Sequence, residues 1–403
     1  MKRLSKAARE HIKTAGIILL SALALFLALK LGVFAQLWAA MRSESGSYVG
    51  TSAVPELAEG ARPCVIAVTN AEGARLCAAW DFAAADALYD RTAGFMSEAL
   101  SSVGSFVETT EEAWRNALQE EGIYYEYSQS ATLDTIRAWL GARPGESGER
   151  SLCRLCLSAA EERLYLQCGE SFYSAPIEGV LEGQGISGEY ESVSFAFEES
   201  RDIASPYVML VSARFPVYTA KNPLEDEAVL EKILGGLGIS MKLIPGYYGV
   251  DGERVFVAAS KTVTVTRAGD VSVSFCEPYE IFAGTGLSAA ECAQTFLAPL
   301  IRNAGDARVS LSGVDSQDGG ITVTFDYYLS GGRVFLGGNA FTVTFSGGRL
   351  VSAELKISSF DAIEERLTLL PALQAAAVSD DAALGYSGGE TLRPFWYDRR
   401  ALT

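Results

Sequence analysis

The most apolar part of the chain lies near its N-terminus. Residues 14–29 contain no charged side chain, and the apolar pattern continues past Lys30 to about residue 37. A helix needs about 20 such residues to cross the hydrocarbon core of a bilayer. The pattern therefore predicts a transmembrane helix over residues 14–37.

The residues before this stretch predict how the helix is oriented. Residues 1–13 carry five basic side chains and a single acidic one, Glu10. Basic flanks of this kind stay in the cytoplasm, so we expect a cytoplasmic tail over residues 1–13. The protein is then expected to cross the cell membrane once, with everything after the helix on the extracytoplasmic side.

A cleavable signal peptide has a similar layout, and residues 33–35 (Val-Phe-Ala) resemble a small-residue cleavage site. Lys30 favours an anchor instead. A charge interrupts the apolar core of a cleavable signal, whereas in an anchor the lysine side chain can reach the outer headgroups. We therefore favour an uncleaved anchor, followed by a small and polar tether over residues 38–60.

Beyond the tether, helical and strand patterns alternate, and they predict an α+β domain over residues 61–178. Helices are expected at about 82–103 and 133–140, with a shorter helix between them that a Thr109–Glu112 capping box would start. Strands are expected at 64–68, 123–127, 152–157, 163–168 and 171–177. The third and fourth of these strands predict a hairpin, because only a short polar turn separates them.

A Gly- and Glu-rich segment at residues 179–189 predicts a linker, and a repeat follows it. YYGVDGERVFV at residues 247–257 is echoed by YYLSGGRVFL at residues 327–336, with one residue deleted. In both copies an alternating strand follows and ends in a glycine turn, at Gly269 in the first copy and at 347–348 in the second.

A helical pattern precedes each copy of the repeat. Asn222 is the expected N-cap of the first helix, with Pro223 at its first position, and Ser288 is the expected cap of the second. We therefore expect two α+β repeat units, over residues 190–284 and 285–403. The predicted fold class is α+β, with mainly antiparallel sheets, packed helices and a duplicated helix-plus-hairpin unit.

The part expected outside the membrane is strongly acidic. The chain has 33 Lys and Arg against 50 Asp and Glu, and residues 1–42 hold seven of the basic residues and one of the acidic ones. This leaves 26 basic and 49 acidic residues, a net charge of −23. Such a surface repels nucleic acid and anionic lipid, so we expect no nucleic-acid partner.

Enzyme motifs in the chain lack the partners that their chemistry requires. Residues 385–389 match the G-x-S-x-G nucleophile pattern, but Ser387 would need a histidine base, and the only histidine is His11 in the predicted tail. Residues 183–188 match G-x-G-x-x-G without the helix that must follow a dinucleotide site. We expect a glycine-rich turn and a linker, and no catalytic or cofactor-binding residue.

Metal sites are not indicated either. Asp315 and Asp318 lack the ligand ladder of a calcium loop, and a hairpin turn explains them better. Cys153 and Cys156 would point to opposite faces of a strand, so core packing is the expectation for them and for most of the seven cysteines. A disulfide between Cys153 and Cys168 stays open, because a hairpin register could bring them opposite each other.

Several elements occur in a characteristic order along the chain. They are the basic tail with its single helix, EYSQSATLDTIRAWL at Glu126–Leu140, RLYLQC at Arg163–Cys168, the two repeat elements above, and a closing Gly385-Tyr386 followed by Leu392-Arg393-Pro394-Phe395-Trp396. This order resembles the YycH/YycI family of Gram-positive bacteria, and the YycH member most. Members of that family are membrane-anchored accessory proteins of the WalK sensor-kinase system.

The resemblance implies a non-catalytic regulator of cell-wall metabolism that binds a WalK-like sensor histidine kinase and a sister protein of the YycH/YycI type. The predicted membrane helix offers a contact surface, because small residues let such helices pack closely. The small residues that share one face are Ser21, Ala24, Ala28 and Gly32. A lipid-facing anchor in which alanine is simply common is the alternative for this face.

A different class of function is also compatible with an exported acidic protein. It is a cell-wall-binding module or a carboxylate-based glycan hydrolase, since two acids that meet in space leave no mark in the sequence. In such a protein Tyr124, Tyr125 and Tyr127 would be candidates for sugar recognition, although aromatic residues of a buried strand explain the three tyrosines better.

Overall fold

The computed structural model describes most of the chain beyond residue 61. The described residues are 62–145, 150–177, 207, 214–279, 289–301, 305–317, 320–370, 374 and 381–399. The predicted tail (1–13), membrane helix (14–37), tether (38–60) and linker (179–189) lie outside them. None of the helices in the described ranges is both long enough and apolar enough to span a bilayer.

Residues 65–176 form an antiparallel sheet that has seven strands in the described part of the chain. In spatial order the strands are β2 (Arg75–Ala79), β1 (Val65–Thr69), β4 (Gly122–Thr132), β5 (Ser151–Ser158), β6 (Arg163–Cys168), β7 (Ser171–Pro176) and β3 (Val107–Thr109). The strands predicted from the apolar pattern are confirmed by β1, β4, β5, β6 and β7, and β5 and β6 form the predicted hairpin. We call this sheet the small sheet.

Helices cover both faces of the small sheet. On one face, Thr92 of α3 (Phe82–Ser102) shares a 2.6 Å hydrogen bond with the Tyr125 hydroxyl. Helix α5 (Leu133–Trp139) packs on the same face, because its Trp139 ring lies 5.6 Å from that of Tyr127. On the opposite face, Trp114 of α4 (Glu111–Ala117) packs against Tyr124 at 6.3 Å between ring centroids. This division follows from the alternation of side chains along β4.

The predicted helices at 82–103 and 133–140 are confirmed by α3 and α5, but the predicted cap of the short helix is wrong by one residue. Thr109 belongs to β3, where it pairs with Phe172 of β7. Thr110 is the N-cap of α4, and its hydroxyl accepts a 3.2 Å hydrogen bond from the Ala113 amide. Strand pairing thus holds Thr109 in extended backbone and moves the cap to the next residue.

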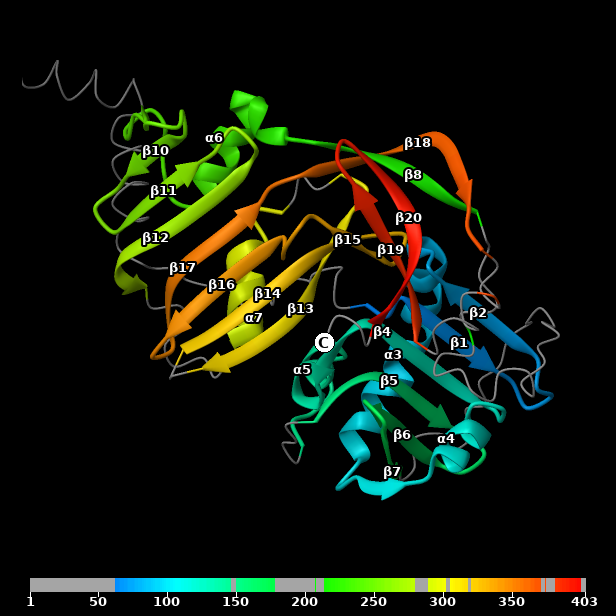
Figure 1. The fold of residues 1–403 in the computed structure, drawn as a ribbon. Coiled ribbons are helices and arrows are strands. Elements are labelled where there is room, and N and C mark those ends of the chain that lie inside the picture. Colours follow the sequence, from blue (N-terminus) through cyan, green and yellow to red (C-terminus); the bar gives the residue numbers. More distant parts are fainter. Residues whose placement is uncertain are drawn as a thin grey trace, which may run out of the picture.

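Residues 214–398 form a second sheet, which we call the large sheet and which has thirteen strands among the described residues (Figure 1). Twelve of them follow in spatial order: β18 (Ser359–Thr368), β8 (Arg214–Lys221), β20 (Thr391–Asp398), β19 (Ala382–Gly388), β15 (Gly332–Phe335), β14 (Gly320–Leu329), β16 (Phe341–Ser346), β17 (Arg349–Lys356), β12 (Asp270–Tyr279), β11 (Lys261–Val265), β10 (Arg254–Val257) and β9 (Tyr247–Tyr248). The thirteenth, β13 (Arg308–Gln317), pairs with β14. Neighbouring strands are antiparallel except β15 and β19, which run parallel.

The two copies of the sequence repeat lie side by side in the large sheet. Strands β10, β11 and β12 of the first copy correspond to β15, β16 and β17 of the second, and the antiparallel pair β12–β17 joins the copies. In the first copy β10 pairs with β11, whereas in the second β15 pairs with β14 and β19 instead. The predicted units 190–284 and 285–403 therefore contribute strands to one continuous sheet.

The predicted glycine turns of the repeat are confirmed. Gly269 has a φ of 94°, and Gly347 and Gly348 have φ values of 56° and 74°. Glycine adopts this left-handed region without the steric cost that a side chain brings.

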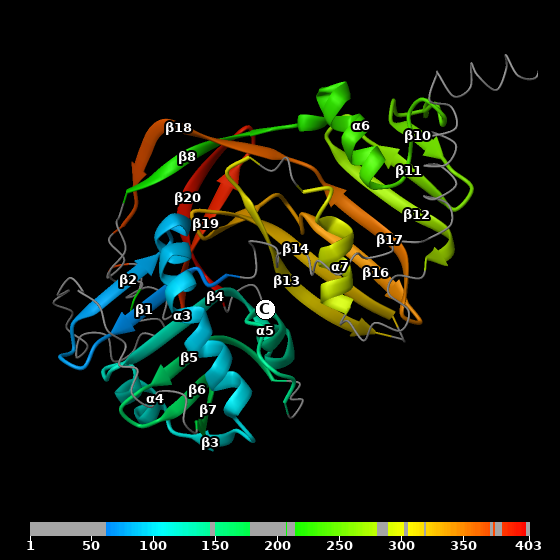
Figure 2. The ribbon, with the colours of Figure 1, turned by 180° about the vertical axis from the view of Figure 1, so that it is seen from behind.

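Helices α6 (Glu227–Gly236) and α7 (Ala289–Leu297) cover the same face of the large sheet (Figure 2). Asn222 caps a short 3-10 helix, η4 (Pro223–Glu225), rather than α6 itself, and its side chain accepts a 2.9 Å hydrogen bond from Leu224. Asp226 is the N-cap of α6. The predicted cap of the second helix, Ser288, lies outside the described residues.

Candidate functional site

The residues that the sequence nominates as a helix-packing interface are Ser21, Ala24, Ala28 and Gly32. All four lie outside the described residues, so this surface stays a prediction.

The G-x-S-x-G match lies in a hairpin and not in a nucleophile elbow. Ser387 belongs to β19 and pairs with Arg393 of β20, so no helix follows it as the elbow requires. Gly388 has a φ of 148° at the turn between the two strands. The predicted glycine-rich turn is confirmed.

The cysteines of the small sheet are free thiols. Cys156 is buried and contacts the Ala117 carbonyl oxygen at 3.7 Å, which confirms the expected core packing, while Cys153 is half-buried. Cys153 and Cys168 are not joined by a disulfide in this structure. Asp315 lies on β13 opposite Thr322 of β14, next to the predicted turn, and Asp318 lies outside the described residues.

The tyrosines considered for sugar recognition are not available to a ligand. Tyr124, Tyr125 and Tyr127 are 2%, 0% and 3% exposed. The sugar-binding role for them is therefore wrong, and the alternative of aromatic residues in a strand core is confirmed.

The sharpest concentration of buried charge lies where the two sheets meet. Glu126 on β4 is fully buried, and Arg154, which lies opposite it on β5, is 2% exposed. The large sheet contributes Asp381, directly before β19, and Arg399, directly after β20. Figure 1 shows the β19–β20 hairpin reaching from the large sheet to β4. We call these four residues the junction quartet.

Each acid of the junction quartet binds the arginine of the other sheet. Arg399 donates a hydrogen bond to the Glu126 carboxylate, and Arg154 donates one to Asp381. Arg154 Nη2 also lies 3.6 Å from Glu126 Oε1. The other oxygen, Oε2 of Glu126, accepts a 2.7 Å hydrogen bond from the Tyr124 hydroxyl. The quartet therefore balances two cations against two anions and crosses between the sheets twice.

The surroundings of the quartet keep both arginines charged. Burial by itself lowers the pKa of Arg154 and Arg399, because a desolvated cation is less stable. Glu126 and Asp381 outweigh burial and hold the pKa of both arginines well above the ordinary arginine value. The quartet thus keeps two positively charged guanidiniums buried beside its two carboxyl groups.

Two turns with left-handed backbone touch each other beside the quartet. Trp80, between β2 and α3, has a φ of 55°, and Ser330, between β14 and β15, has a φ of 48°. Gly331 packs so closely that a Cβ there would lie 3.2 Å from the Trp80 Cα atom. The Arg399 guanidinium lies over the Trp80 ring, 5.8 Å from its centroid. A bulky residue with positive φ is strained, so contacts between the sheets must hold this turn.

A second ionic contact joins the sheets at α3. Arg308 on β13 donates two hydrogen bonds to Asp86 on α3, one of them 2.9 Å long, and Arg62 lies 3.1 Å from the same carboxylate. Burial alone raises the pKa of Asp86, but the two arginines bring it below its ordinary value. The Asp86 side chain is 27% exposed, so this contact is weaker than the quartet.

The junction is built to hold the sheets in place and not to carry out proton transfer. A general acid or base needs a group that can exchange protons with a substrate, whereas both carboxylates of the quartet are bound to guanidiniums. No group of three or more His, Cys, Asp and Glu side chains in the described ranges is placed to hold a metal ion. Removing one partner of a buried ion pair costs about 3–5 kcal/mol, because the other charge is then left buried and unpaired, so the quartet acts as a clamp between the sheets as long as all four charges are present.

Sequence reasoning missed the junction quartet because its members are far apart in the chain. Glu126 and Arg399 are separated by 273 positions. One local signal was present: Glu126 interrupts a strand of tyrosines, and a charged residue in such a strand is buried only when it is paired. That signal identifies Glu126 but not its partners.

The fold and the junction define this chain as an α+β protein made of two joined, mainly antiparallel sheets. No family model matches the chain, and no curated protein matches it. Among solved structures, the chain is similar to the crystal structure of YycH from Bacillus subtilis, with a TM-score of 0.44 and 12% sequence identity over 84% of this chain and 94% of that chain. A likeness of this degree assigns neither a family nor a function.

Proposed function

We propose that this chain is a non-catalytic, membrane-anchored accessory regulator of a sensor histidine kinase that controls cell-wall metabolism. A single helix over residues 14–37 anchors it in the cell membrane, with the N-terminus in the cytoplasm and both sheets on the extracytoplasmic side. Its partners are a WalK-like kinase and a sister protein of the YycH/YycI type. The contacts run through the membrane helix and the extracytoplasmic sheets.

The observation that carries the proposal is the order of sequence elements that resembles the YycH/YycI family. Within Glu126–Leu140, β4 runs directly into α5, with no residue between Thr132 and Leu133. The closing element forms the β19–β20 hairpin, in which Gly385 lies opposite Phe395. Both elements lie at the junction quartet, since Glu126 is on β4 and Asp381 and Arg399 flank the β19–β20 hairpin.

The junction quartet gives the proposed regulator a means to transmit force. The small sheet follows the predicted membrane helix in the chain, and the large sheet comes after it. Because the quartet clamps the two sheets, a partner that displaces the large sheet would also displace the small sheet.

The proposal is tested in native membranes with variants of the predicted packing face. Replacing Ala28 and Gly32 by leucine should reduce cross-linking of the full-length chain to the kinase, because leucine prevents close approach of the helices. The matched control replaces Ala15 and Ala22, which lie about 115–135° away from the centre of that face on a helix of 3.6 residues per turn. If the leucine variant at Ala28 and Gly32 cross-linked to the kinase as well as the control variant at Ala15 and Ala22, the predicted packing face would be refuted.

A further inference from the structure

A surface at the end of the large sheet carries a concentration of exposed apolar side chains. Nine large hydrophobic residues are exposed among the described residues, and five of them lie within one short segment: Leu243, Tyr247, Tyr248, Val250 and Val257. Single exposed apolar residues are normal on a protein surface. Contiguous groups of them mark interaction sites.

This surface includes an edge of the large sheet. Strand β9 ends the spatial order of strands, and β10 is its only neighbour among the described residues. Tyr247 and Tyr248 of β9 are 56% and 72% exposed. An edge strand offers backbone N–H and C=O groups with which an added extended segment can pair.

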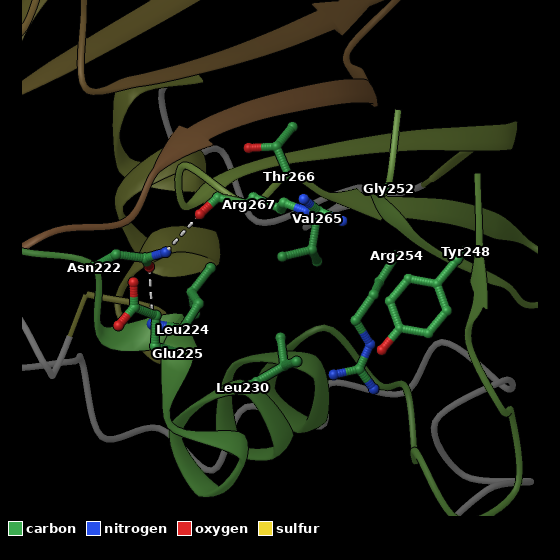
Figure 3. A pocket seen from close by; sticks show the side chains of 10 residues that line it. All are labelled: Asn222, Leu224, Glu225, Leu230, Tyr248, Gly252, Arg254, Val265, Thr266 and Arg267. Atoms are coloured by element: carbon green, nitrogen blue, oxygen red, sulfur yellow. Dashed lines mark hydrogen bonds between the residues drawn. The ribbon is translucent and has the colours of Figure 1, made fainter. Parts of the chain in front are cut away.

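A cavity of about 340 Å³ opens beside this edge. Leu224 of η4, Leu230 of α6 and Val265 of β11 line its apolar part, as Figure 3 shows. Leu224 and Leu230 are buried in the core behind it, so the cavity has a fixed floor. The floor can accept an aliphatic side chain.

The polar groups of the cavity are divided between its two ends. Figure 3 shows Arg254 and Tyr248 at one end, and Asn222 and Glu225 at the other. The guanidinium of Arg267 also lies at the first end, against Gly252. A Cβ atom placed on Gly252 would lie 2.7 Å from Nη2 of Arg267. One end is therefore cationic, and the other offers oxygen atoms that can accept hydrogen bonds.

The two arginines of the cationic end differ in their pairing. Arg254 donates hydrogen bonds of 2.9 and 3.1 Å to the two carboxylate oxygens of Glu227 on α6. Arg267 forms no ion pair within the described part of the chain. Arg267 can therefore bind a carboxylate from another molecule without breaking an ion pair. The chain has a net charge of −17, so the rest of its surface repels acidic partners.

We propose that this surface docks an extended peptide segment of a partner protein that carries an acidic side chain between apolar ones. The segment pairs its backbone with β9 and lays its apolar side chains on Tyr248 and on the floor of the cavity. Its carboxylate binds Arg267. The docking surface is independent of the membrane helix and of the proposed kinase.

The experiment measures binding of fluorescein-labelled heptapeptides to the full-length chain in lipid nanodiscs by fluorescence anisotropy, with empty nanodiscs as the blank. The three peptides alternate valine with aspartate, with asparagine or with lysine. We expect the aspartate peptide to bind at least about tenfold more tightly than the asparagine peptide, and the lysine peptide to bind most weakly. Replacement of the exposed Tyr248 by serine should weaken binding of all three peptides.

Charge reversal at the cavity gives the sharpest readout. Arg267→Glu should reverse the order, so that the lysine peptide binds more tightly than the aspartate peptide. Arg393→Glu is the matched control, because Arg393 is an exposed arginine on β20 and undergoes the same charge change. The control should leave the order unchanged, and both variants should melt at the temperature of the parent protein.

Three outcomes would overturn the proposal. They are the same affinity for the aspartate and asparagine peptides, an order that Arg267→Glu does not alter, and the absence of aspartate-peptide binding up to roughly 1 mM.

Discussion

Replacing Glu126 by glutamine should destabilise the protein more than any change of a surface acid. The side chains of Glu126, Arg154 and Arg399 are 0%, 3% and 11% exposed. Glutamine keeps the volume and can still accept the Tyr124 hydroxyl, but it leaves two buried guanidiniums with a single carboxylate, that of Asp381. Removing one partner of a buried pair costs about 3–5 kcal/mol, and we expect a loss of this size in the free energy of unfolding.

A double-mutant cycle shows whether the loss comes from the pair. Arg399→Met alone should also cost about 3–5 kcal/mol, because it leaves Glu126 without its partner. With both replacements the charges of Glu126 and Arg399 are removed together, so neither is left buried without its partner. The double variant should therefore be at least about 2 kcal/mol more stable than the sum of the single losses predicts.

The assay is urea unfolding of the full-length chain in nanodiscs, followed by tryptophan fluorescence, to which Trp80 beside Arg399 contributes. Glu108→Gln is the matched control, since Glu108 is an exposed acid on β3, and it should change stability by no more than about 0.5 kcal/mol. The clamp would be refuted if Glu126→Gln cost less than about 1 kcal/mol, or if the two single losses simply added in the double variant.

Three further predictions follow from other contacts. Folding lowers the pKa of Asp86, so its contacts with Arg308 stabilise the protein at pH values above the ordinary pKa of 3.8, and this stabilisation is lost as the pH falls through the lower pKa of the folded state. Asp86→Asn should therefore cost about 1–2 kcal/mol at pH 7. The urea midpoints of variant and parent should converge below pH 4. Burial raises the pKa of the Cys64 thiol far above its ordinary value, so iodoacetamide at pH 8 should alkylate the exposed Cys276 and spare Cys64 in the folded protein. Peptide mass spectrometry reads the labelling, and equal labelling of the two cysteines would contradict the burial of Cys64. Gly331→Ala should lower the free energy of unfolding by about 1–2 kcal/mol, because Gly331 has a φ of 85° and the added methyl group would meet Trp80. A variant that melts at the temperature of the parent would contradict the close contact between the sheets.

The local elements of the fold could be predicted because each is encoded by neighbouring residues. The apolar spacing of residues 82–103 gives α3, and the aromatic run at 123–127 gives β4. The repeat was visible as well, since both copies keep the strand and the glycine turn. The capping box failed at Thr109 because strand pairing with a distant segment decides where that helix begins.

The junction and the docking surface could not be predicted in this way. Arg399 meets Glu126 only after strands from distant parts of the chain have paired, and the cavity beside Arg267 closes only when η4 and α6 pack against the β10–β11 hairpin. The repeat predicts similar strands in both copies, yet β10 of the first copy pairs with β11, whereas its counterpart β15 pairs with β19 instead of β16. Which strand becomes an edge, as β9 does, depends on the whole sheet and not on its two tyrosines.

The proposed function is tested most directly by the autophosphorylation rate of the sensor kinase in vesicles that also contain the full-length chain. We expect that the chain changes this rate, that the leucine variant at Ala28 and Gly32 loses the effect, and that the control variant at Ala15 and Ala22 keeps it. A kinase whose rate is the same with and without the chain, while the chain is shown to be folded in the vesicles, would contradict the account.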